Sequence, residues 1–202
     1  MIQVKQNDTV LFIFFSLIFF AVLQCFQDHL IYRHDLFWNQ PWRWWTAHWV
    51  HVGWIHYVLN VLALMCLPFL FPQINKKALL GLLIVLPPLL SLSFYFFYPE
   101  IYAYAGLSGI LHGLFVFSAL MSLKEKSERH FALIILLGII LKLVWEHFFG
   151  ALQTQQLIGH PVLTQAHLLG VIYGSLAAAL CLFFQINVFN TKLQTSKESH
   201  FD

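Results

Sequence analysis

Residues 107–123 read LSGILHGLFVFSALMSL, an apolar run that contains Ser108, His112 and two glycines four positions apart but no charged side chain. A helix of this length spans about 26 Å at 1.5 Å per residue, close to the ~30 Å hydrocarbon core of a bilayer. Five further stretches are comparably long and apolar: residues 10–27, 53–72, 78–98, 131–148 and 167–186. We therefore predict an all-α membrane protein with six transmembrane helices.

The composition supports this prediction. Of 202 residues, 59% are hydrophobic and only 10% are charged, which is too little polar surface to cover a soluble globule. A net charge of +2 gives no reason to expect a nucleic-acid partner, so membrane lipid is the expected surrounding. We expect residues 1–190 to form a single six-helix domain and residues 191–202 to form a short polar cytoplasmic tail.

Basic residues predict the orientation of the helices. One side of the predicted spans holds Lys5, Lys76, Lys77, Lys124, Lys126, Arg129, Lys192 and Lys197. The opposite loops hold only Arg33 and Arg43. The positive-inside rule then places both termini in the cytoplasm, so the second, fourth and sixth helices all begin at the outer face.

Polar residues lie at the outer ends of these three helices. Ser108 is 15 residues from the cytoplasmic end of its span, which places it roughly 7 Å below the outer surface of the hydrocarbon core. His167 falls near the same boundary. A serine beside a histidine can form an acyl-enzyme, with the imidazole as general base, and this predicts an intramembrane serine hydrolase. His56 and Asn60, four residues apart on the second helix, are candidate donors to the oxyanion, as is the amide of Ser108.

Small residues predict that the fourth and sixth helices pack closely. Gly109 and Gly113 are spaced four apart, as are Gly170 and Gly174, and such pairs allow helix backbones to approach. His167 lies on the same stripe as Gly170 and Gly174, so the contact would aim its imidazole at Ser108. We expect His51, five residues before His56, to point elsewhere and to make a structural hydrogen bond.

The order of these motifs resembles the rhomboid intramembrane serine proteases. The resemblance rests on His51-x4-His56-x3-Asn60, Gly106-x-Ser108-Gly109 and Ala166-His167-x2-Gly170-x3-Gly174. It implies a six-helix rhomboid-like bundle without cofactor or metal, with Ser108 as nucleophile, His167 as base, and His56, Asn60 and the Ser108 amide as oxyanion donors.

Three further segments look like the bacterial subgroup called rhombosortases: PWRWWT at residues 41–46, GLSGILHG at 106–113 and KLVWE at 142–146. This implies a multi-pass protein of the bacterial inner membrane with its active site facing the periplasm. The implied substrates are exported proteins with a C-terminal sorting tail made of a glycine-rich motif, a transmembrane segment and basic residues.

Two features depart from the common rhomboid pattern. His112 stands where many rhomboids have a tyrosine beneath the catalytic histidine, and we expect it to support His167. Lys142 and Glu146 form an i,i+4 pair in the fifth helix, which we interpret as a neutralising ion pair, with a contact to substrate as the alternative. No aspartate is placed to orient His167, so we expect a dyad.

Two other functions stay open at this point. Histidines near the outer side (His48, His51, His56, His112, His160 and His167) also suit a haem- or metal-binding membrane protein. An inactive rhomboid relative that only binds transmembrane clients is the other alternative. Residues 28–49, rich in tryptophan, are expected to form an interfacial element in the outer leaflet, and His48, His130, His147 and His160 to be interfacial.

Overall fold

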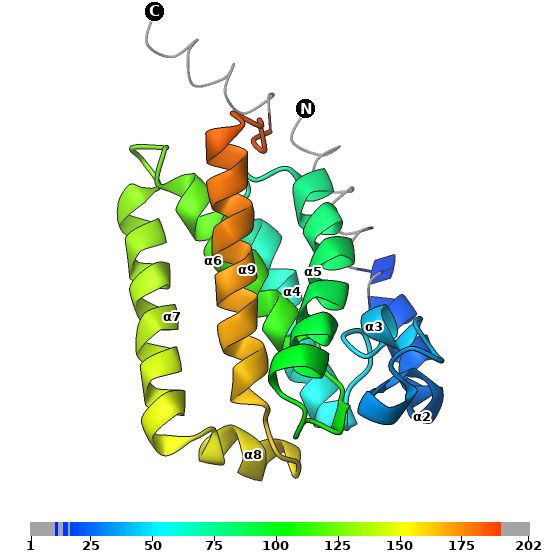
Figure 1. Cartoon of the computed structure of the whole chain (residues 1–202). Helices are drawn as coiled ribbons and strands as arrows, with labels where there is room; N and C mark the ends of the chain where they lie inside the picture. Colours follow the sequence, from blue (N-terminus) through cyan, green and yellow to red (C-terminus); the bar gives the residue numbers. More distant parts are fainter. Residues whose placement is uncertain (1–10, 12–13, 16, 191–202) are drawn as a thin grey trace, which may run out of the picture.

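The computed structural model describes residues 11, 14–15 and 17–190 of the chain. The predicted tail, residues 191–202, lies outside the described residues, as does part of the first predicted span, of which residues 17–24 are helical. Figure 1 shows a bundle of helices with short segments at one end. The elements, in order, are α2 Gln27–Leu30, β1 Tyr32–Arg33, η1 His34–Leu36, α3 Arg43–Thr46, α4 Trp54–Leu70, α5 Lys76–Phe97, β2 Ala103–Tyr104, α6 Ser108–Ser122, α7 Arg129–Phe149, α8 Leu152–Ile158 and α9 Thr164–Phe183.

Three of the described helices are long and apolar enough to cross a membrane by length and composition: α5, α7 and α9. Two more, α4 and α6, are apolar but shorter, with 17 and 15 residues. These five helices fall within a few residues of predicted spans, whereas α8 was not predicted. The chain is thus a multi-pass membrane protein with a helical bundle.

Helix α6 occupies the centre of the bundle. It contacts α4, α5, α7 and α9, and its side chains are mostly buried. Because protein rather than lipid surrounds it, α6 does not need the full length of a lipid-exposed span. Its first residue is Ser108, and α6 begins toward the end of the bundle at which α4 and α9 also begin (Figure 1).

The seam between α6 and α9 is built from glycines, as predicted. A Cβ added to Gly109 would lie 2.8 Å from the Ala166 carbonyl oxygen, and one added to Gly113 would lie 2.9 Å from that of Gly170. A Cβ on Gly170 or Gly174 would overlap the backbone of the facing glycine. The two helices are therefore in backbone contact, which fixes their relative position.

Helix α5 contains two prolines, Pro87 and Pro88. Pro88 has no N–H, so the carbonyl of Ile84 one turn earlier loses its helical partner. The indole N–H of Trp45, just after the start of α3, donates to this carbonyl at 2.9 Å. The segment before α4 is thus attached to α5 at the point where the helix lacks a backbone bond.

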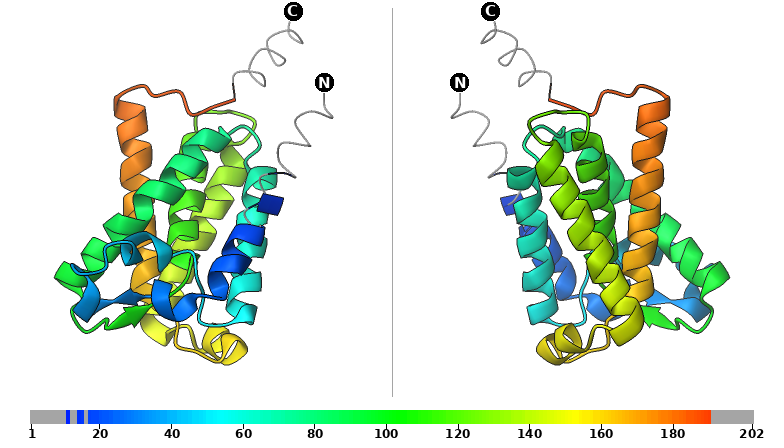
Figure 2. Two further views of the ribbon diagram at one scale, coloured as in Figure 1. Left: turned by 90° about the vertical axis from the view of Figure 1, so that its right-hand side faces the viewer. Right: turned by 90° about the vertical axis from the view of Figure 1, so that its left-hand side faces the viewer.

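The segment from residue 27 to residue 52 consists of short elements at the end of the bundle beside α5 (Figure 2). Strand β1 pairs antiparallel with β2, with Tyr32 opposite Tyr104. The tryptophans of this segment differ in exposure. Trp38 and Trp42 are about half exposed, while Trp44 is partly buried and stacks on Phe37. An ordered aromatic segment of this kind fits the predicted interfacial element.

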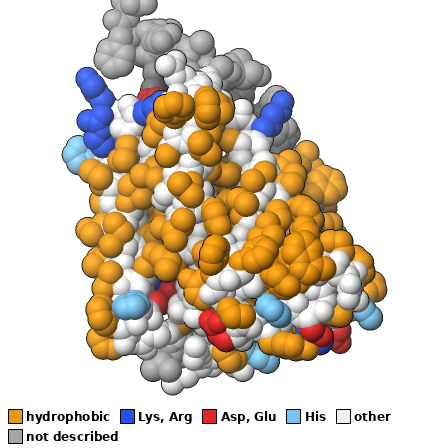
Figure 3. All heavy atoms as spheres, viewed as in Figure 1, with side chains coloured by type: hydrophobic (Ala, Val, Ile, Leu, Met, Phe, Trp, Pro, Cys, Tyr) orange, Lys and Arg blue, Asp and Glu red, His pale blue; other side chains and the backbone are white. Residues whose placement is uncertain are grey.

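The outer surface is apolar, as a lipid-facing surface must be. Figure 3 shows hydrophobic side chains over the flank of the bundle, with Lys and Arg mainly at its upper end and His, Asp and Glu mainly at its lower end. Helix α7 contributes much of this surface, because only 11% of its most apolar stretch is buried. The loop between α6 and α7 and the first residue of α7, at the upper end of the bundle in Figure 1, carry the exposed Lys124, Lys126 and Arg129.

Candidate active site

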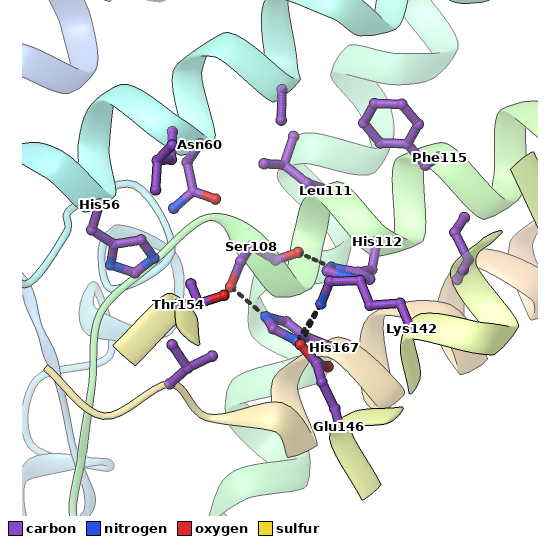
Figure 4. Close-up of a pocket in the computed structure, with 14 residues that line it drawn as sticks. His56, Asn60, Ser108, Leu111, His112, Phe115, Lys142, Glu146, Thr154 and His167 are labelled. Atoms are coloured by element: carbon purple, nitrogen blue, oxygen red, sulfur yellow. Dashed lines mark hydrogen bonds and ion pairs between the residues drawn. The ribbon is translucent and has the colours of Figure 1, made fainter. Parts of the chain in front are cut away.

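A cavity of about 300 Å³ opens between the ends of α4, α6, α7 and α9 (Figure 4). Its lining combines apolar side chains with polar groups from all four helices: His56, Asn60, Ser108, His112, Lys142, Glu146 and His167. The three polar motifs that the sequence places at one depth therefore meet in one cavity.

Ser108 and His167 are within hydrogen-bond distance of each other. Ser108 Oγ lies 3.0 Å from His167 Nε2, and His167 is buried. The α6–α9 seam sets this distance, because Gly109 follows the serine directly and its Cα packs on the carbonyl of Ala166, the residue before the histidine. The serine itself is half-buried and faces the cavity, where a carbonyl carbon could reach its oxygen.

The loop before Ser108 is held by its own hydrogen bonds. Tyr104 Oη donates to the Gly106 carbonyl at 2.6 Å, and the Gly106 N–H donates to the Ala47 carbonyl at 3.0 Å. Gly106 has φ +148°, a conformation that side chains other than glycine rarely adopt. Since Ser108 is the first residue of α6, its N–H has no acceptor one turn earlier in the helix.

His56 and Asn60 are on the cavity-facing side of α4, one turn apart (Figure 4). The amide nitrogen of Asn60 is buried and has no hydrogen-bond partner among the described residues, and the same is true of His56 Nδ1. A buried donor without a partner is costly, so an unused Asn60 N–H beside Ser108 is a group available to a bound substrate.

His112 stacks directly on His167. The ring centroids are 4.2 Å apart and the planes differ by 17°. His112 Nδ1 lies 2.7 Å from the Ser108 carbonyl oxygen, so Nδ1 carries the proton and donates it. His112 therefore lies against one face of the His167 ring, and its supporting role stays a prediction.

Glu146 makes a contact that the sequence did not predict. Its ion pair with Lys142 is present, but the other carboxylate oxygen lies 2.7 Å from His167 Nδ1. The sequence offered no aspartate to orient His167, and the residue that contacts its Nδ1 is instead a glutamate. This glutamate belongs to α7 and is not close to Ser108 or His167 in the sequence. Because Lys142 lies four residues before it, the sequence had already explained its charge as half of an ion pair.

His51 and His48 also differ from expectation. Because α4 begins only at Trp54, helical spacing does not apply to His51, and its ring contacts that of His56 edge-on with centroids 5.1 Å apart. Its backbone, rather than its imidazole, bonds to the Gln24 side chain. His48 is fully buried rather than interfacial, with Nε2 at 3.0 Å from Ser91 Oγ.

Several histidines near this end of the bundle lie close together, but those in the described part of the chain are not arranged as metal ligands. Among the described residues, no group of three or more His, Cys, Asp or Glu side chains is arranged to hold a metal ion. His112 and His167 are stacked face to face, an arrangement in which their ring nitrogens do not point at a common centre.

Comparison with known proteins agrees with the geometry. The chain matches the family model described as Rhomboid domain over residues 38–184, a range that runs from before α3 through α9 and includes every polar residue of the cavity. A search of curated proteins gave no match. The matched range covers well over half of the chain. The protein therefore belongs to the rhomboid family of intramembrane serine proteases.

Proposed function

We propose that the protein is an intramembrane serine endopeptidase in which Ser108 is the nucleophile and His167 the general base. The observation that carries the proposal is the 3.0 Å distance between Ser108 Oγ and His167 Nε2 in a cavity within a helical bundle. His167 Nδ1 donates to Glu146, so Nε2 is the bare nitrogen and accepts the serine proton.

The reaction proceeds through an acyl-enzyme. Ser108 Oγ attacks the scissile carbonyl carbon while its proton passes to His167 Nε2, and the carbonyl oxygen becomes an oxyanion. The imidazolium then protonates the leaving amine as the C–N bond breaks. Water, activated by the same imidazole, hydrolyses the ester and regenerates Ser108. The cavity opens at the outer end of the bundle, where this water is available.

The oxyanion requires donors that are in place before it forms. We assign this role to the Asn60 side-chain N–H, to His56 and to the Ser108 backbone N–H. The Asn60 nitrogen is buried without a partner among the described residues, and the Ser108 N–H is unpaired within its helix. His56 and Asn60 project from α4 and Ser108 from α6, and all three line the cavity (Figure 4).

For the substrate, we propose a rhombosortase-like specificity. The three segments that resemble this subgroup support it, and they imply exported proteins with a glycine-rich motif, a transmembrane segment and basic residues at the C-terminus. In this proposal the chain crosses the bacterial inner membrane six times, with both termini cytoplasmic and the cavity facing the periplasm. The basic residues at the far end of the bundle support this orientation.

The first test is cleavage in liposomes of a reporter that carries such a tail. We expect Ser108→Ala and His167→Ala each to lower kcat/KM at least about 1000-fold, because each removes a group that takes part in bond formation. Ser118→Ala is the matched control: it removes a serine of the same helix whose buried hydroxyl has no donor or acceptor partner among the described residues and lies outside the cavity.

Cleavage by Ser108→Ala at the wild-type rate would overturn the proposal. If no reporter is cleaved, reaction of Ser108 with a fluorophosphonate decides between two cases. Labelling shows an active serine and a wrong reporter, and lack of labelling favours an inactive rhomboid relative that binds clients.

A further inference from the structure

We propose that Glu146 is a positioning residue for His167, so that this rhomboid acts through a Ser-His-Glu triad in which Lys142 sets the charge of the acid. The inference rests on the proposed function and adds to it a third and a fourth residue from α7. The observation behind it is the contact of one carboxylate with two partners, His167 Nδ1 through one oxygen and Lys142 Nζ through the other (Figure 4).

The geometry distinguishes this contact from a simple ion pair. The Glu146 side chain is 7% exposed and that of His167 is 5% exposed, and their 2.7 Å bond is as short as a charge-assisted hydrogen bond. The bond fixes the ring on one side while the His112 stack fixes its face. The ring is thereby held in the tautomer that leaves Nε2 bare toward Ser108.

The charge of Lys142 explains why the acid is ionised while the histidine is neutral. A buried carboxylate whose sole partner is an imidazole draws a proton onto that imidazole, and an imidazolium cannot accept the serine proton. Lys142 pairs its ammonium with Glu146, and its half-exposed stem lets the ammonium reach this site from the membrane boundary. Lys142 and Glu146 therefore have opposite effects on the protonation of the His167 ring: the carboxylate favours the imidazolium and the ammonium disfavours it.

Other ionisable groups face this site from three elements. His112 lies on α6 and His56 on α4, both on the cavity wall. His160, in the loop after α8, lies near His56. None of these is an anion, so the negative charge at His167 comes from Glu146.

The test measures the rate of fluorophosphonate labelling of Ser108 against pH, which needs no substrate. We expect Glu146→Gln to lower the plateau rate on the order of 100-fold, less than in a triad whose histidine lacks a stacked support. The fall in labelling rate on the acid side of its pH profile should move to lower pH, because the His167 imidazolium is no longer stabilised by a carboxylate. Lys142→Met should move this fall to higher pH and keep the plateau within a few-fold. In reporter cleavage, Glu146→Gln should lower kcat and leave KM unchanged.

The matched control is Glu100→Gln, an exposed carboxylate at the same end of the bundle, which should leave rate and profile unchanged. The double variant Lys142→Met/Glu146→Gln tests the alternative that Glu146 only neutralises Lys142. That alternative requires the double variant to regain the wild-type rate. We expect it to stay as slow as Glu146→Gln.

A measurement on the wild-type protein covers the case in which Glu146→Gln does not fold. Nitrogen-15 spectra of the histidine rings, with His167 assigned by its loss in His167→Ala, should show a protonated Nδ1 and a bare Nε2 at neutral pH. The opposite tautomer overturns the triad, as does wild-type labelling by Glu146→Gln with an unshifted profile. If the wild-type protein itself does not label at Ser108, the proposed function fails and the triad with it.

Discussion

Gly106 illustrates how one residue without a side chain shapes the cavity. A Cβ at this position would lie 2.7 Å from His56 Cε1, closer than real Cβ contacts, and the φ of +148° is strained for alanine. The glycine therefore makes room for His56 and lets the chain turn into α6. Its substitution should affect the oxyanion donors rather than the Ser108–His167 bond.

We expect Gly106→Ala to lower kcat/KM by about 10- to 100-fold, because loss of one oxyanion donor has an effect of this order or larger. The strained backbone adds a cost of about 1–3 kcal/mol to folding. Gly53→Ala is the control, since Gly53 has an extended φ of 178° and nothing within 4 Å of an added Cβ. Equal activity of both variants in the reporter assay would show that the cavity does not depend on this glycine.

At the scale of elements, the seam between α6 and α9 determines how Ser108 and His167 meet. A Cβ on Gly174 would lie 2.7 Å from the Cα of Gly113, so alanine would force the helices apart along their whole contact. Gly174 is two turns from His167 and outside the cavity. A change there reaches the site only through the position of α9.

We expect Gly174→Ala to destabilise the protein by about 1–3 kcal/mol through overpacking, and so to lower the thermal midpoint by several degrees. Labelling of Ser108 should slow in parallel. Gly138→Ala, in the lipid-facing helix α7, has open space around the added methyl and serves as control. It should leave labelling unchanged. A Gly174→Ala protein with the wild-type midpoint would contradict a close seam.

The same scale shows what the sequence could predict. Apolar length predicted five helices close to their observed ends, and glycine spacing predicted which two meet, because both depend on local periodicity. The bond from Glu146 to His167 was missed, since it depends on the rotation of α7 about its axis, which no local pattern specifies. The prediction for His51 was wrong for a related reason. It assumed helical spacing to His56, but His51 lies before α4 begins.

At the scale of the whole molecule, two buried histidines outside the spans link stability to pH. Burial lowers the pKa of His48 to about 3 and that of His51 to about 3, against 6.5 for a free histidine. Below pH 6.5 the unfolded chain therefore binds more protons than the folded chain. Their contribution to stability is fully present above pH 6.5 and is lost as the pH falls toward 3.

We expect the thermal midpoint in detergent to fall between pH 7 and pH 4.5, at a free-energy cost on the order of 1 kcal/mol per pH unit for each histidine. His48→Gln should flatten this dependence, because an amide can donate to Ser91 without titrating. The exposed His29→Gln is the control and should follow the wild type. A wild-type midpoint that does not change over this range would contradict the linkage.

The burial of His48 also marks a limit of sequence reasoning. A histidine near a membrane boundary is usually interfacial, and nothing in the local sequence reveals that it packs under α5 against Ser91. Its partner is 43 residues away. Non-local polar pairs of this kind, like Glu146 with His167, become visible only when the helices are assembled.

The position of α7 at the periphery has a consequence for how the bilayer acts on the enzyme. Serine and base are joined through helices in backbone contact, so a change in membrane thickness moves them together. Glu146 is carried by the lipid-facing helix α7, whose most apolar stretch is only 11% buried. Hydrophobic mismatch tilts such a helix at small cost. If Glu146 positions His167 as we propose, we expect lipid composition to act first on the contact of Glu146 with His167, and so to change turnover while the Ser108–His167 bond stays intact.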